Sequence, residues 1–269
     1  MVTSPNKNNL PKPLKYYRKL ATRKGRLEAG AFVIEGERAV RQVVENQPVV
    51  EDRPDAVLEI VSIEDTPSLY PQYPHRAVTE SQFRHITSSK TPQGVLAVVS
   101  LPMETYSASL PALSGSRLPD GDRVLFLEDI QDPGNVGTLI RTAAAFNFSG
   151  VILTEKSADP FSPKCVQSTA GSVLSLWLRR TKDCMGMVKE LKEQGYFLLA
   201  ADLNGKEDAT VLTGRHNLVL ALGNEASGLS DEVLKMADYR LRLPTVREKA
   251  ESLNVAACGA ILMYLSADL

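Results

Sequence analysis

Short apolar runs that alternate with helical patterns restrict the possible folds of this chain more than any other feature of its sequence. The runs lie at residues 124–127, 151–153, 174–178, 197–201, 218–222 and 239–243. Apolar strands separated by helices are typical of a largely parallel sheet that is covered on both faces. Ligands bind such sheets at the carboxyl ends of the strands. We therefore predict an α/β domain and expect its functional residues in the loops that follow these runs.

The N-terminal part of the chain has a weaker pattern of the same kind. Residues 32–34 and 94–99 have the composition of strands, and residues 37–46 carry apolar side chains at helical spacing. Proline, serine and glycine are concentrated between Leu101 and Asp122, as is common in linkers. The predicted organisation is an N-terminal domain over residues 1–102, a linker over residues 103–121 and a second domain over residues 122–269.

Positive charge is concentrated near the N-terminus, although the whole chain of 269 residues has a net charge of -1. No acidic residue precedes Glu28, and the basic residues before it include Arg26. A field of this sign suits a phosphate backbone, whereas the alternative interpretation is a solvated terminus without a ligand. The residues predicted to contact such a backbone are Lys15, Arg18, Lys19, Arg23 and Lys24.

Several other classes of protein are disfavoured by what the sequence lacks. No apolar stretch near its start suits a secretory signal, and its longest apolar run, residues 255–265, is shorter than the ~20 residues of a membrane span. We therefore expect a cytoplasmic protein without a membrane segment. The cysteines and histidines are scattered, which predicts free thiols and no metal site. Dinucleotide-binding glycine motifs, phosphate loops and serine triads are absent, so an unrelated nucleotide-binding enzyme is a remote alternative.

The loop over residues 127–137 is the first of three that follow predicted strands and are rich in small and amide residues. Asn135 is suited to cap the helix that this loop opens. Capping does not explain Arg141, which follows Asn135 by six residues among apolar and small neighbours. We interpret Arg141 either as a surface residue with an extended side chain or as a charge placed at a site.

The second and third loops cover residues 222–230 and 243–254. Gly223 would allow a ligand to approach the backbone closely, and Glu225 could accept hydrogen bonds from a ribose or an amine. The third loop opens the long apolar helix near the C-terminus, for which Ser252 is a candidate N-cap. A plain strand-to-helix turn would account for the glycines of the second loop but not for its Asn-Glu pair.

In this order, the three loops resemble the three signature motifs of the SpoU (TrmH-like) branch of the SPOUT methyltransferases. The resemblance covers residues 124–265. The matching segments are an asparagine six residues before an arginine (Asn135 and Arg141), Gly-Asn-Glu at 223–225 and Ser-Leu-Asn-Val-Ala at 252–256. The N-terminal half is similar to the L30e/L7Ae-like substrate-binding domain of this family, in residues 32–37 and 91–95.

This resemblance implies an α/β fold with a SPOUT-type parallel sheet and a C-terminal trefoil knot, preceded by a smaller α/β domain of the L30e/L7Ae type. It also implies S-adenosylmethionine as the cofactor, RNA as the substrate and a homodimer formed through the C-terminal domain. The catalytic positions carried over are Arg141, Asn135, Ser252, Asn254 and Glu225. The implied cofactor contacts are Gly223, Leu243 and Leu253, with Leu222 and Asn224 beside them.

The activity that the resemblance implies is methylation of a ribose 2'-hydroxyl, with large-subunit (23S) ribosomal RNA favoured as the substrate. A tRNA substrate, methylation of an antibiotic site in ribosomal RNA, and a non-catalytic RNA-binding protein of the same fold are the alternatives. Arg141 could act as the base or orient the hydroxyl.

Two features depart from the family pattern. Residues 245–251 contain no glycine and are one residue longer than usual, which predicts a reshaped cofactor loop. Gln167 stands where relatives commonly carry an arginine, so one contact to RNA or to a partner subunit is not expected here.

Overall fold

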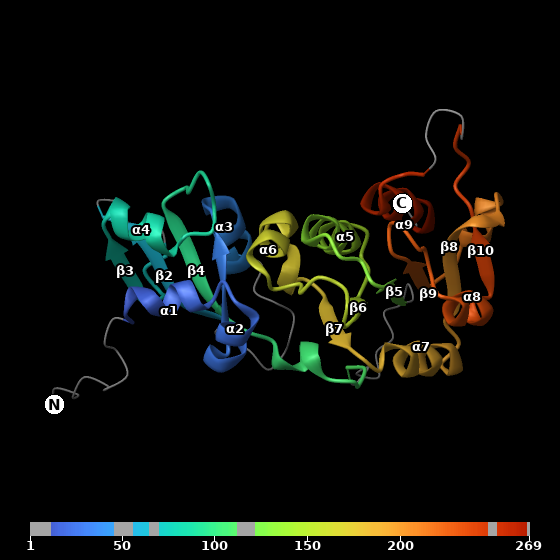
Figure 1. Cartoon of the computed structure of the whole chain (residues 1–269), viewed down its shortest axis with the longest axis horizontal. Coiled ribbons are helices and arrows are strands. Elements are labelled where there is room, and N and C mark those ends of the chain that lie inside the picture. The colour runs from blue at the N-terminus through green and yellow to red at the C-terminus, as the bar shows by residue number, and fades with distance from the viewer. Residues whose placement is uncertain (1–11, 46–55, 65–69, 112–121, 247–251, 268–269) are drawn as a thin grey trace. The chain divides into compact units, whose positions relative to one another are not determined.

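The computed structural model describes residues 12–45, 56–64, 70–111, 122–246 and 252–267. The chain divides into two compact units, Met1–Leu101 and Pro102–Leu269, and each is described by itself (Figure 1). Within the described residues, no helix is long and apolar enough to cross a membrane.

The N-terminal unit is a four-stranded mixed sheet with short helices. Its strands are β1 (Ala31–Glu35), β2 (Val57–Ile63), β3 (His75–Val78) and β4 (Val95–Ser100), in the order β1-β4-β2-β3. Strand β4 is antiparallel to β1 and β2, whereas β3 is parallel to β2. The helices are α1 (Leu14–Lys19), α2 (Arg23–Ala29), α3 (Glu37–Glu45) and α4 (Glu80–Ile86). The strands and the helix predicted in this part of the sequence are thus confirmed.

The core of the N-terminal unit explains why its first helix is ordered. Tyr17 and Leu20 at the end of α1 are fully buried and pack with Phe83 of α4 and Leu96 of β4. Helix α2 begins after Thr22, whose hydroxyl accepts a hydrogen bond from the Gly25 amide. The basic N-terminal segment is therefore attached to the sheet by apolar side chains on its inner face.

The C-terminal unit contains a six-stranded parallel sheet in the order β10-β8-β9-β5-β6-β7. The strands are β5 (Asp122–Leu127), β6 (Gly150–Thr154), β7 (Trp177–Thr181), β8 (Phe197–Lys206), β9 (Asn217–Leu222) and β10 (Tyr239–Leu241). Every pair of neighbours is parallel. All six residues of β5 are buried, because this strand lies inside the sheet and is covered on both faces. The predicted α/β domain with a parallel sheet is confirmed.

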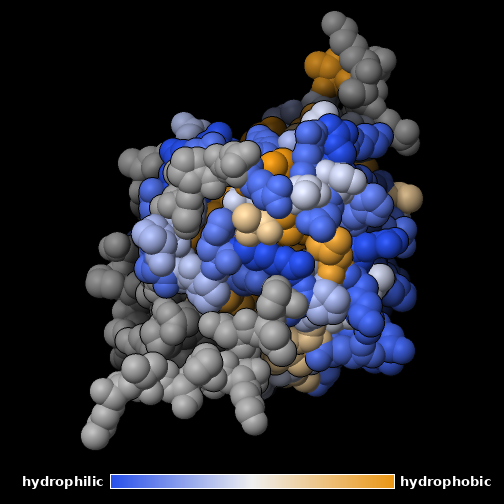
Figure 2. Space-filling model, turned by 90° about the vertical axis from the view of Figure 1, so that its left-hand side faces the viewer, coloured by the Kyte–Doolittle hydropathy of each residue, from blue (hydrophilic) through white to orange (hydrophobic). Residues whose placement is uncertain are grey.

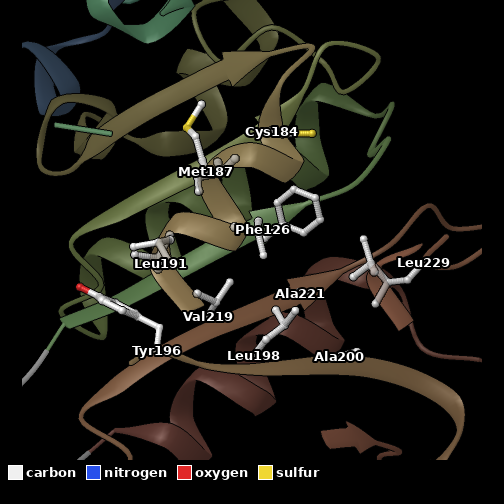
Figure 3. Close-up of a cluster of buried hydrophobic side chains, with 14 residues drawn as sticks. Phe126, Cys184, Met187, Leu191, Tyr196, Leu198, Ala200, Val219, Ala221 and Leu229 are labelled. Atoms are coloured by element: carbon white, nitrogen blue, oxygen red, sulfur yellow. The ribbon is translucent and has the colours of Figure 1, made fainter. Parts of the chain in front are cut away.

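Helices cover both faces of this sheet (Figure 1). They are α5 (Pro133–Ala145), α6 (Pro163–Thr169), α7 (Cys184–Glu193), α8 (Asp231–Met236) and α9 (Val255–Ser266), with 3-10 turns η1 (Met103–Tyr106), η2 (Ser172–Leu174) and η3 (Ala209–Leu212). Alternate strand residues point to opposite faces. Val124 and Phe126 pack against Met187 and Leu191 of α7 in the cluster drawn in Figure 3.

On the other face, α9 packs against α5 and β9. Gly259 of α9 makes this contact close, since a Cβ there would lie 2.4 Å from Leu139 Cδ2 and 2.7 Å from Leu222 Cδ1. The helix can therefore rest directly on buried leucines of α5 and of the sheet.

The strand predicted at residues 174–178 is displaced. Leu174 closes the 3-10 turn η2, and the strand is β7, which continues into the polar residues Arg179 and Arg180. Arg179 is only 7% exposed, and its Nε donates to the Ser109 carbonyl at 2.7 Å. Apolar periodicity cannot reveal a strand that contains a buried arginine and a half-buried one, both hydrogen-bonded to distant backbone carbonyls. Residues 103–111, which were predicted to belong to the linker, contain η1, which packs against β7, while 112–121 lie outside the described residues.

Candidate active site

The first motif loop is ordered by Asp132, and the prediction that Asn135 caps its helix is wrong. Helix α5 begins at Pro133, and the Asp132 carboxylate accepts hydrogen bonds from the amides of Gly134 at 2.6 Å and Asn135 at 3.0 Å. A hydrogen bond from Lys164, followed by the one from the Asn135 amide, lowers the pKa of Asp132. Because Asp132 is the cap, the side chain of Asn135 is free for other partners.

Asn135 connects all three motif loops. Its Nδ2 donates to Glu225 Oε1 at 2.8 Å, and its Oδ1 accepts from Asn254 Nδ2 at 3.1 Å. Asn254 is itself the N-cap of α9, since its Oδ1 accepts from the amides of Ala256 and Ala257. The result is a directed chain of hydrogen bonds from the start of α9 through two amide groups to a carboxylate. The orientation of each amide is fixed by the donors and acceptors on either side.

Two residues predicted to be catalytic stand apart from this chain of hydrogen bonds. Ser252 is exposed, and the prediction that it caps α9 is wrong because Asn254 does so. Arg141 is exposed on α5, and among the described residues it has no hydrogen bond or ion pair with the other motif residues. The structure thus brings together Asn135, Glu225 and Asn254, and it leaves Arg141 accessible to a ligand.

The second motif loop is a tight turn that Asn224 holds together. Asn224 Oδ1 accepts from the amides of Ala226 at 2.9 Å and Ser227 at 3.1 Å, and the backbones of Asn224 and Gly228 form a bridge. A Cβ on Gly223 would lie 2.2 Å from the Gly228 carbonyl carbon. The glycine is therefore required for closure of the loop itself. From the sequence, we had expected this glycine to allow a ligand to approach the backbone.

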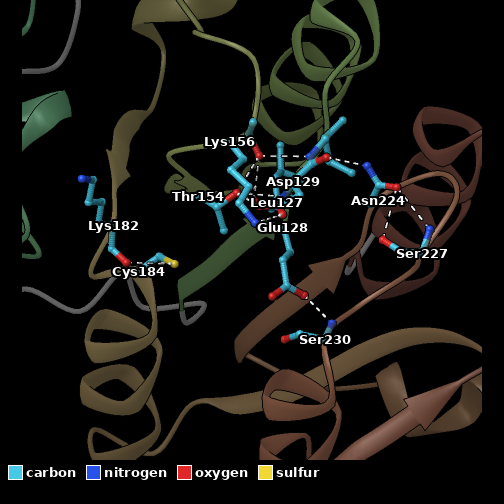
Figure 4. Close-up of polar contacts among 12 residues, drawn as sticks. Leu127, Glu128, Asp129, Thr154, Lys156, Lys182, Cys184, Asn224, Ser227 and Ser230 are labelled. Atoms are coloured by element: carbon cyan, nitrogen blue, oxygen red, sulfur yellow. Dashed lines mark hydrogen bonds and ion pairs between the residues drawn. The ribbon is translucent and has the colours of Figure 1, made fainter.

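Glu128 and Asp129 of the first loop, for which the sequence predicted no role, bind the second loop and fix its position. Asn224 Nδ2 donates to the Asp129 carbonyl at 2.8 Å, and the Ser230 amide donates to Glu128 Oε2 at 2.7 Å (Figure 4). These contacts join residues that are 95 and 102 positions apart in the sequence. No local spacing in the sequence could have indicated them.

The residues implied as cofactor contacts differ in how accessible their side chains and backbone groups are to a ligand. The side chain of Leu222 is 1% exposed, and its carbonyl accepts from the Glu128 amide. Leu243 is half-buried, Leu253 is 39% exposed, and Val246 is 60% exposed. Exposed apolar side chains next to backbone polar groups suit a ligand with a purine ring and polar edges. Leu243 and Leu253 thus leave apolar surface that a ligand such as S-adenosylmethionine could use, and their contact with it stays a prediction.

The predicted phosphate contacts lie on the N-terminal unit. Lys15, Arg18, Lys19, Arg23 and Lys24 are all exposed on α1 and α2. Arg26 of the same basic stretch is 2% exposed, and its guanidinium donates to the carbonyls of Leu20 and Ala21, so it supports the turn between the helices. Figure 2, which views this end of the molecule, shows a largely hydrophilic surface with isolated hydrophobic side chains.

The described residues contain no cluster of three or more His, Cys, Asp or Glu side chains that could hold a metal ion. The three cysteines are free thiols, as predicted. Burial raises the pKa of Cys184 and of Cys258 to about 11, so both stay protonated at neutral pH.

The sequence model of the SpoU rRNA Methylase family matches residues 122–264, more than half of the chain. The chain belongs to the SpoU rRNA methylase family. Its N-terminal part, residues 12–97, matches the MRM3-like substrate binding domain. The chain is 32% identical over 254 residues to the 23S rRNA (guanosine(2553)-2'-O)-methyltransferase RlmP of Bacillus subtilis, which covers 93% of this chain and 94% of that protein.

Solved structures from the SpoU family have the same fold. A putative RNA methyltransferase of the TrmH family from Porphyromonas gingivalis superposes with a TM-score of 0.75 at 30% identity, covering 99% of each chain. The SpoU methyltransferase AviRb from Streptomyces viridochromogenes, in complex with AdoMet, gives 0.76 at 25% identity over 96% of this chain and 97% of that one. As a SpoU methylase, the protein is an RNA methyltransferase that uses S-adenosylmethionine, which confirms the predicted family, enzyme class and cofactor.

Proposed function

We propose that the protein methylates a ribose 2'-hydroxyl in 23S ribosomal RNA. The observation that carries this proposal is the hydrogen-bonded chain Asn254–Asn135–Glu225, which joins the three motif loops at the carboxyl edge of the sheet. The relative RlmP is named as a 2'-O-methyltransferase of 23S rRNA and aligns over nearly the whole chain. The match of residues 12–97 to a substrate binding domain supports a role of the N-terminal unit in binding the RNA substrate.

In this reaction, bound S-adenosylmethionine would supply an electrophilic methyl group on its sulfonium. The protein has to hold the ribose oxygen in line with that methyl group, and alignment of this kind lowers a barrier by roughly 7 to 11 kcal/mol relative to a free encounter. Glu225, fixed by Asn135, would accept a hydrogen bond from the substrate. Asn254 would keep the third loop in register with the first, because it caps α9 and donates to Asn135.

Arg141 would act on the RNA as an orienting cation. A guanidinium group keeps its proton in proteins, so it is a poor base but a strong donor to hydroxyl and phosphate oxygens. Its exposure on α5 leaves it accessible to the phosphate next to the target ribose. Ser252, exposed at the start of the third motif, would contact the same ribose.

A homodimer through α5 and α9 is part of the proposal. Ile261, Tyr264 and Leu265 are exposed at 41%, 57% and 39% on one side of α9, although their spacing is that of an apolar helical face. Exposed apolar surface of this kind marks an interaction site. Such a dimer would cover these three apolar side chains and enclose Arg141. Sedimentation of wild type and Tyr264→Lys tests it: the variant should be monomeric, and a wild-type monomer would exclude this arrangement.

The trefoil knot and the RNA-binding role of the N-terminal unit also belong to the proposal. The chain leaves the edge strand β10 and returns as α9 against α5 and β9, an arrangement that is compatible with the proposed knot. An experimental map traced through residues 247–251 tests the knot. Residues 1–102 would bind RNA as an L30e-like domain, residues 103–121 would link it to the catalytic domain, and residues 122–269 would transfer the methyl group.

The proposed function is tested by transfer of a tritiated methyl group from S-adenosylmethionine to ribosomal RNA and tRNA from a strain that lacks the protein. Digestion to nucleosides should show the label in a 2'-O-methyl nucleoside of 23S rRNA. Label in a base would refute ribose specificity, and label in tRNA would establish the alternative substrate. RNA binding without any transfer would establish the non-catalytic alternative.

A further inference from the structure

Within the second motif loop, residues 223–230 (here called loop 223–230) and the preceding Leu222 are held at three points by two consecutive residues of the first loop. The Glu128 amide donates to the Leu222 carbonyl at 2.9 Å, just before the loop. The Asp129 carbonyl accepts from Asn224 Nδ2 at 2.8 Å, and the Glu128 carboxylate accepts from the Ser230 amide at 2.7 Å. Figure 4 shows the contacts of Asn224 with Asp129 and of Ser230 with Glu128. Both ends of the loop that carries Glu225 are therefore fixed from outside the loop.

Asp129 makes these contacts in an unusual backbone conformation. Its φ of 57° is in the left-handed region, which residues with a Cβ seldom adopt, although aspartate tolerates it better than most. The turn directs the Asp129 carbonyl toward Asn224. A conformation of this kind persists only where the surroundings hold it in place.

Thr154, at the carboxyl end of β6, holds Asp129 in this conformation. The Asp129 amide donates to Thr154 Oγ1 at 2.8 Å, and the same hydroxyl donates back to Asp129 Oδ1 at 2.7 Å. Thr154 is 9% exposed, so water competes little for either bond. The second carboxylate oxygen of Asp129 lies 3.3 Å from Lys156 Nζ. The position of Asp129 is thus determined by a strand that carries none of the three motifs.

These contacts lead step by step to the active site. Asn224, held by Asp129, fixes the turn through the amides of Ala226 and Ser227. Glu225 lies between Asn224 and Ala226 in this turn, and its carboxylate is 2.8 Å from Asn135 Nδ2. A change at Thr154 would therefore reach Glu225 through Asp129 and Asn224.

We propose that Thr154, Asp129 and Glu128 are positioning residues that keep loop 223–230 in its cofactor-binding conformation before the cofactor arrives. They are outside the residues assigned to catalysis or to cofactor contact. The proposal rests on the proposed assignment of this loop to the cofactor. If the loop samples other conformations, the apparent Kd rises in inverse proportion to the fraction that remains competent. Turnover at saturating cofactor changes less, because binding restores the loop.

Thr154 offers a matched pair of variants. Thr154→Val removes the hydroxyl at nearly constant volume, and Thr154→Ser keeps it. Tyr196→Phe is the control for stability alone, because the Tyr196 hydroxyl donates to Asp122 at the amino end of the sheet, far along the strands from the loop. At position 129, Asp129→Ala removes the side-chain oxygen that accepts from Thr154, and Asp129→Asn keeps an acceptor oxygen.

The experiment measures the Kd of S-adenosylmethionine by calorimetry and the amide exchange of residues 222–231 in the unliganded protein. Thr154→Val and Asp129→Ala should each raise Kd and KM about tenfold, with kcat at saturation reduced less than about threefold. Exchange in the loop should accelerate. Thr154→Ser and Asp129→Asn should stay near wild type, and Tyr196→Phe should lower only the Tm. The double variant should be little worse than either single one, since both act through one turn.

Unchanged Kd and unchanged loop exchange in Thr154→Val and Asp129→Ala would overturn the inference and leave these residues a purely structural role. If Thr154→Val does not fold, Glu128→Ala against Glu128→Gln gives the same comparison, because glutamine retains an acceptor for the Ser230 amide. Failure of the wild type to bind S-adenosylmethionine would overturn the proposed function instead. Loop exchange in the unliganded variants would still decide whether these residues order the loop.

Discussion

The carboxyl edge of the C-terminal sheet and the surface of α1 and α2 handle charge and polarity in opposite ways. At the sheet edge, polar side chains bind one another across the sequence: Asn135 and Glu225 are 90 residues apart, and Asn254 and Asn135 are 119 apart. On α1 and α2, the basic side chains other than Arg26 are exposed, and Lys24 forms an ion pair with the nearby Glu28 in which both side chains are largely in solvent. Methyl transfer depends on exact geometry, whereas attraction of a phosphate backbone depends on charge and tolerates movement.

The largest effect is expected for Arg141→Ala. We expect kcat to fall by about 1000-fold or more, the range observed when a group that orients or stabilises the reacting oxygen is removed. The Kd of S-adenosylmethionine should not change, because Arg141 is outside the network of the cofactor loop. Arg141→Lys is the matched control, since it keeps the charge but loses the planar fork. An Arg141→Ala enzyme with wild-type turnover would remove this residue from the site.

Asn135→Asp tests whether the chain of hydrogen bonds is itself required. The substitution removes the donor to Glu225 and places two carboxylates side by side, which raises the pKa of one of them. We expect kcat/KM relative to wild type to fall about 100-fold at pH 8. The ratio should recover as the pH falls toward about 6, because a shared proton then replaces the lost donor.

The pH profile of this ratio is measured against Asn135→Ala, which cannot supply that proton and should show a ratio independent of pH. If both variants have the same flat profile, the contact between positions 135 and 225 does not matter for turnover.

Removal of charge from α1 tests the other side of the comparison. We expect Lys15→Gln with Arg18→Gln and Lys19→Gln to weaken RNA binding at low salt and to reduce the slope of log K against log salt by about 2 to 3. Turnover at saturating RNA should stay near wild type. Titrations at several salt concentrations measure both quantities, and Lys189→Gln with Lys235→Gln on α7 and α8 is the control.

A deletion of residues 1–27 would not test the same point, because it removes the buried side chains of Tyr17, Leu20 and Arg26 along with the charges. Equal loss of affinity in the control variant would show that RNA responds to overall charge and not to this surface.

The smallest effect is expected for Asp132, which orders the helix of the first motif without joining its network. Asp132→Ala should lower the free energy of unfolding by about 1 kcal/mol at pH 7 through loss of the N-cap. Its folded-state pKa is lowered, first by Lys164, so this contribution is present above the unfolded value of about 3.9 and is lost as the pH falls through the folded value. Urea titrations at pH 7 and pH 3 check the difference, and Asp132→Asn should retain most of the cap.

The sequence predicted the sheet because its inner strands, such as β5 and β9, are buried on both faces and therefore largely apolar. It predicted the three loops as functional because they follow these strands. It placed the cap of α5 at Asn135, although Pro133 favours a helix that starts directly after Asp132. Ser252 and Asn254 are both good caps two residues apart, and only the contacts of Asn254 decide between them.

The contacts of Glu128 and Asp129 could not be predicted from the sequence in any comparable way. Glu128 binds a backbone amide 102 residues away, and a backbone amide carries no sequence signal. Strand order also had to come from the structure, since the neighbours β5 and β9 are separated along the chain by three other strands. Without that order, nothing indicates that the first and second loops meet.

Gly259 gives the buried packing of α9 a direct influence on the chemistry. The helix that rests on Leu139 and Leu222 at this glycine begins with Asn254, whose bond to Asn135 is 3.1 Å long. One added methyl group at position 259 would have to displace either a core leucine or the helix. A displacement of the helix start would lengthen and weaken this hydrogen bond, which links the third loop to the first. Mutational drift in the core of this enzyme is therefore constrained by the reaction as well as by folding.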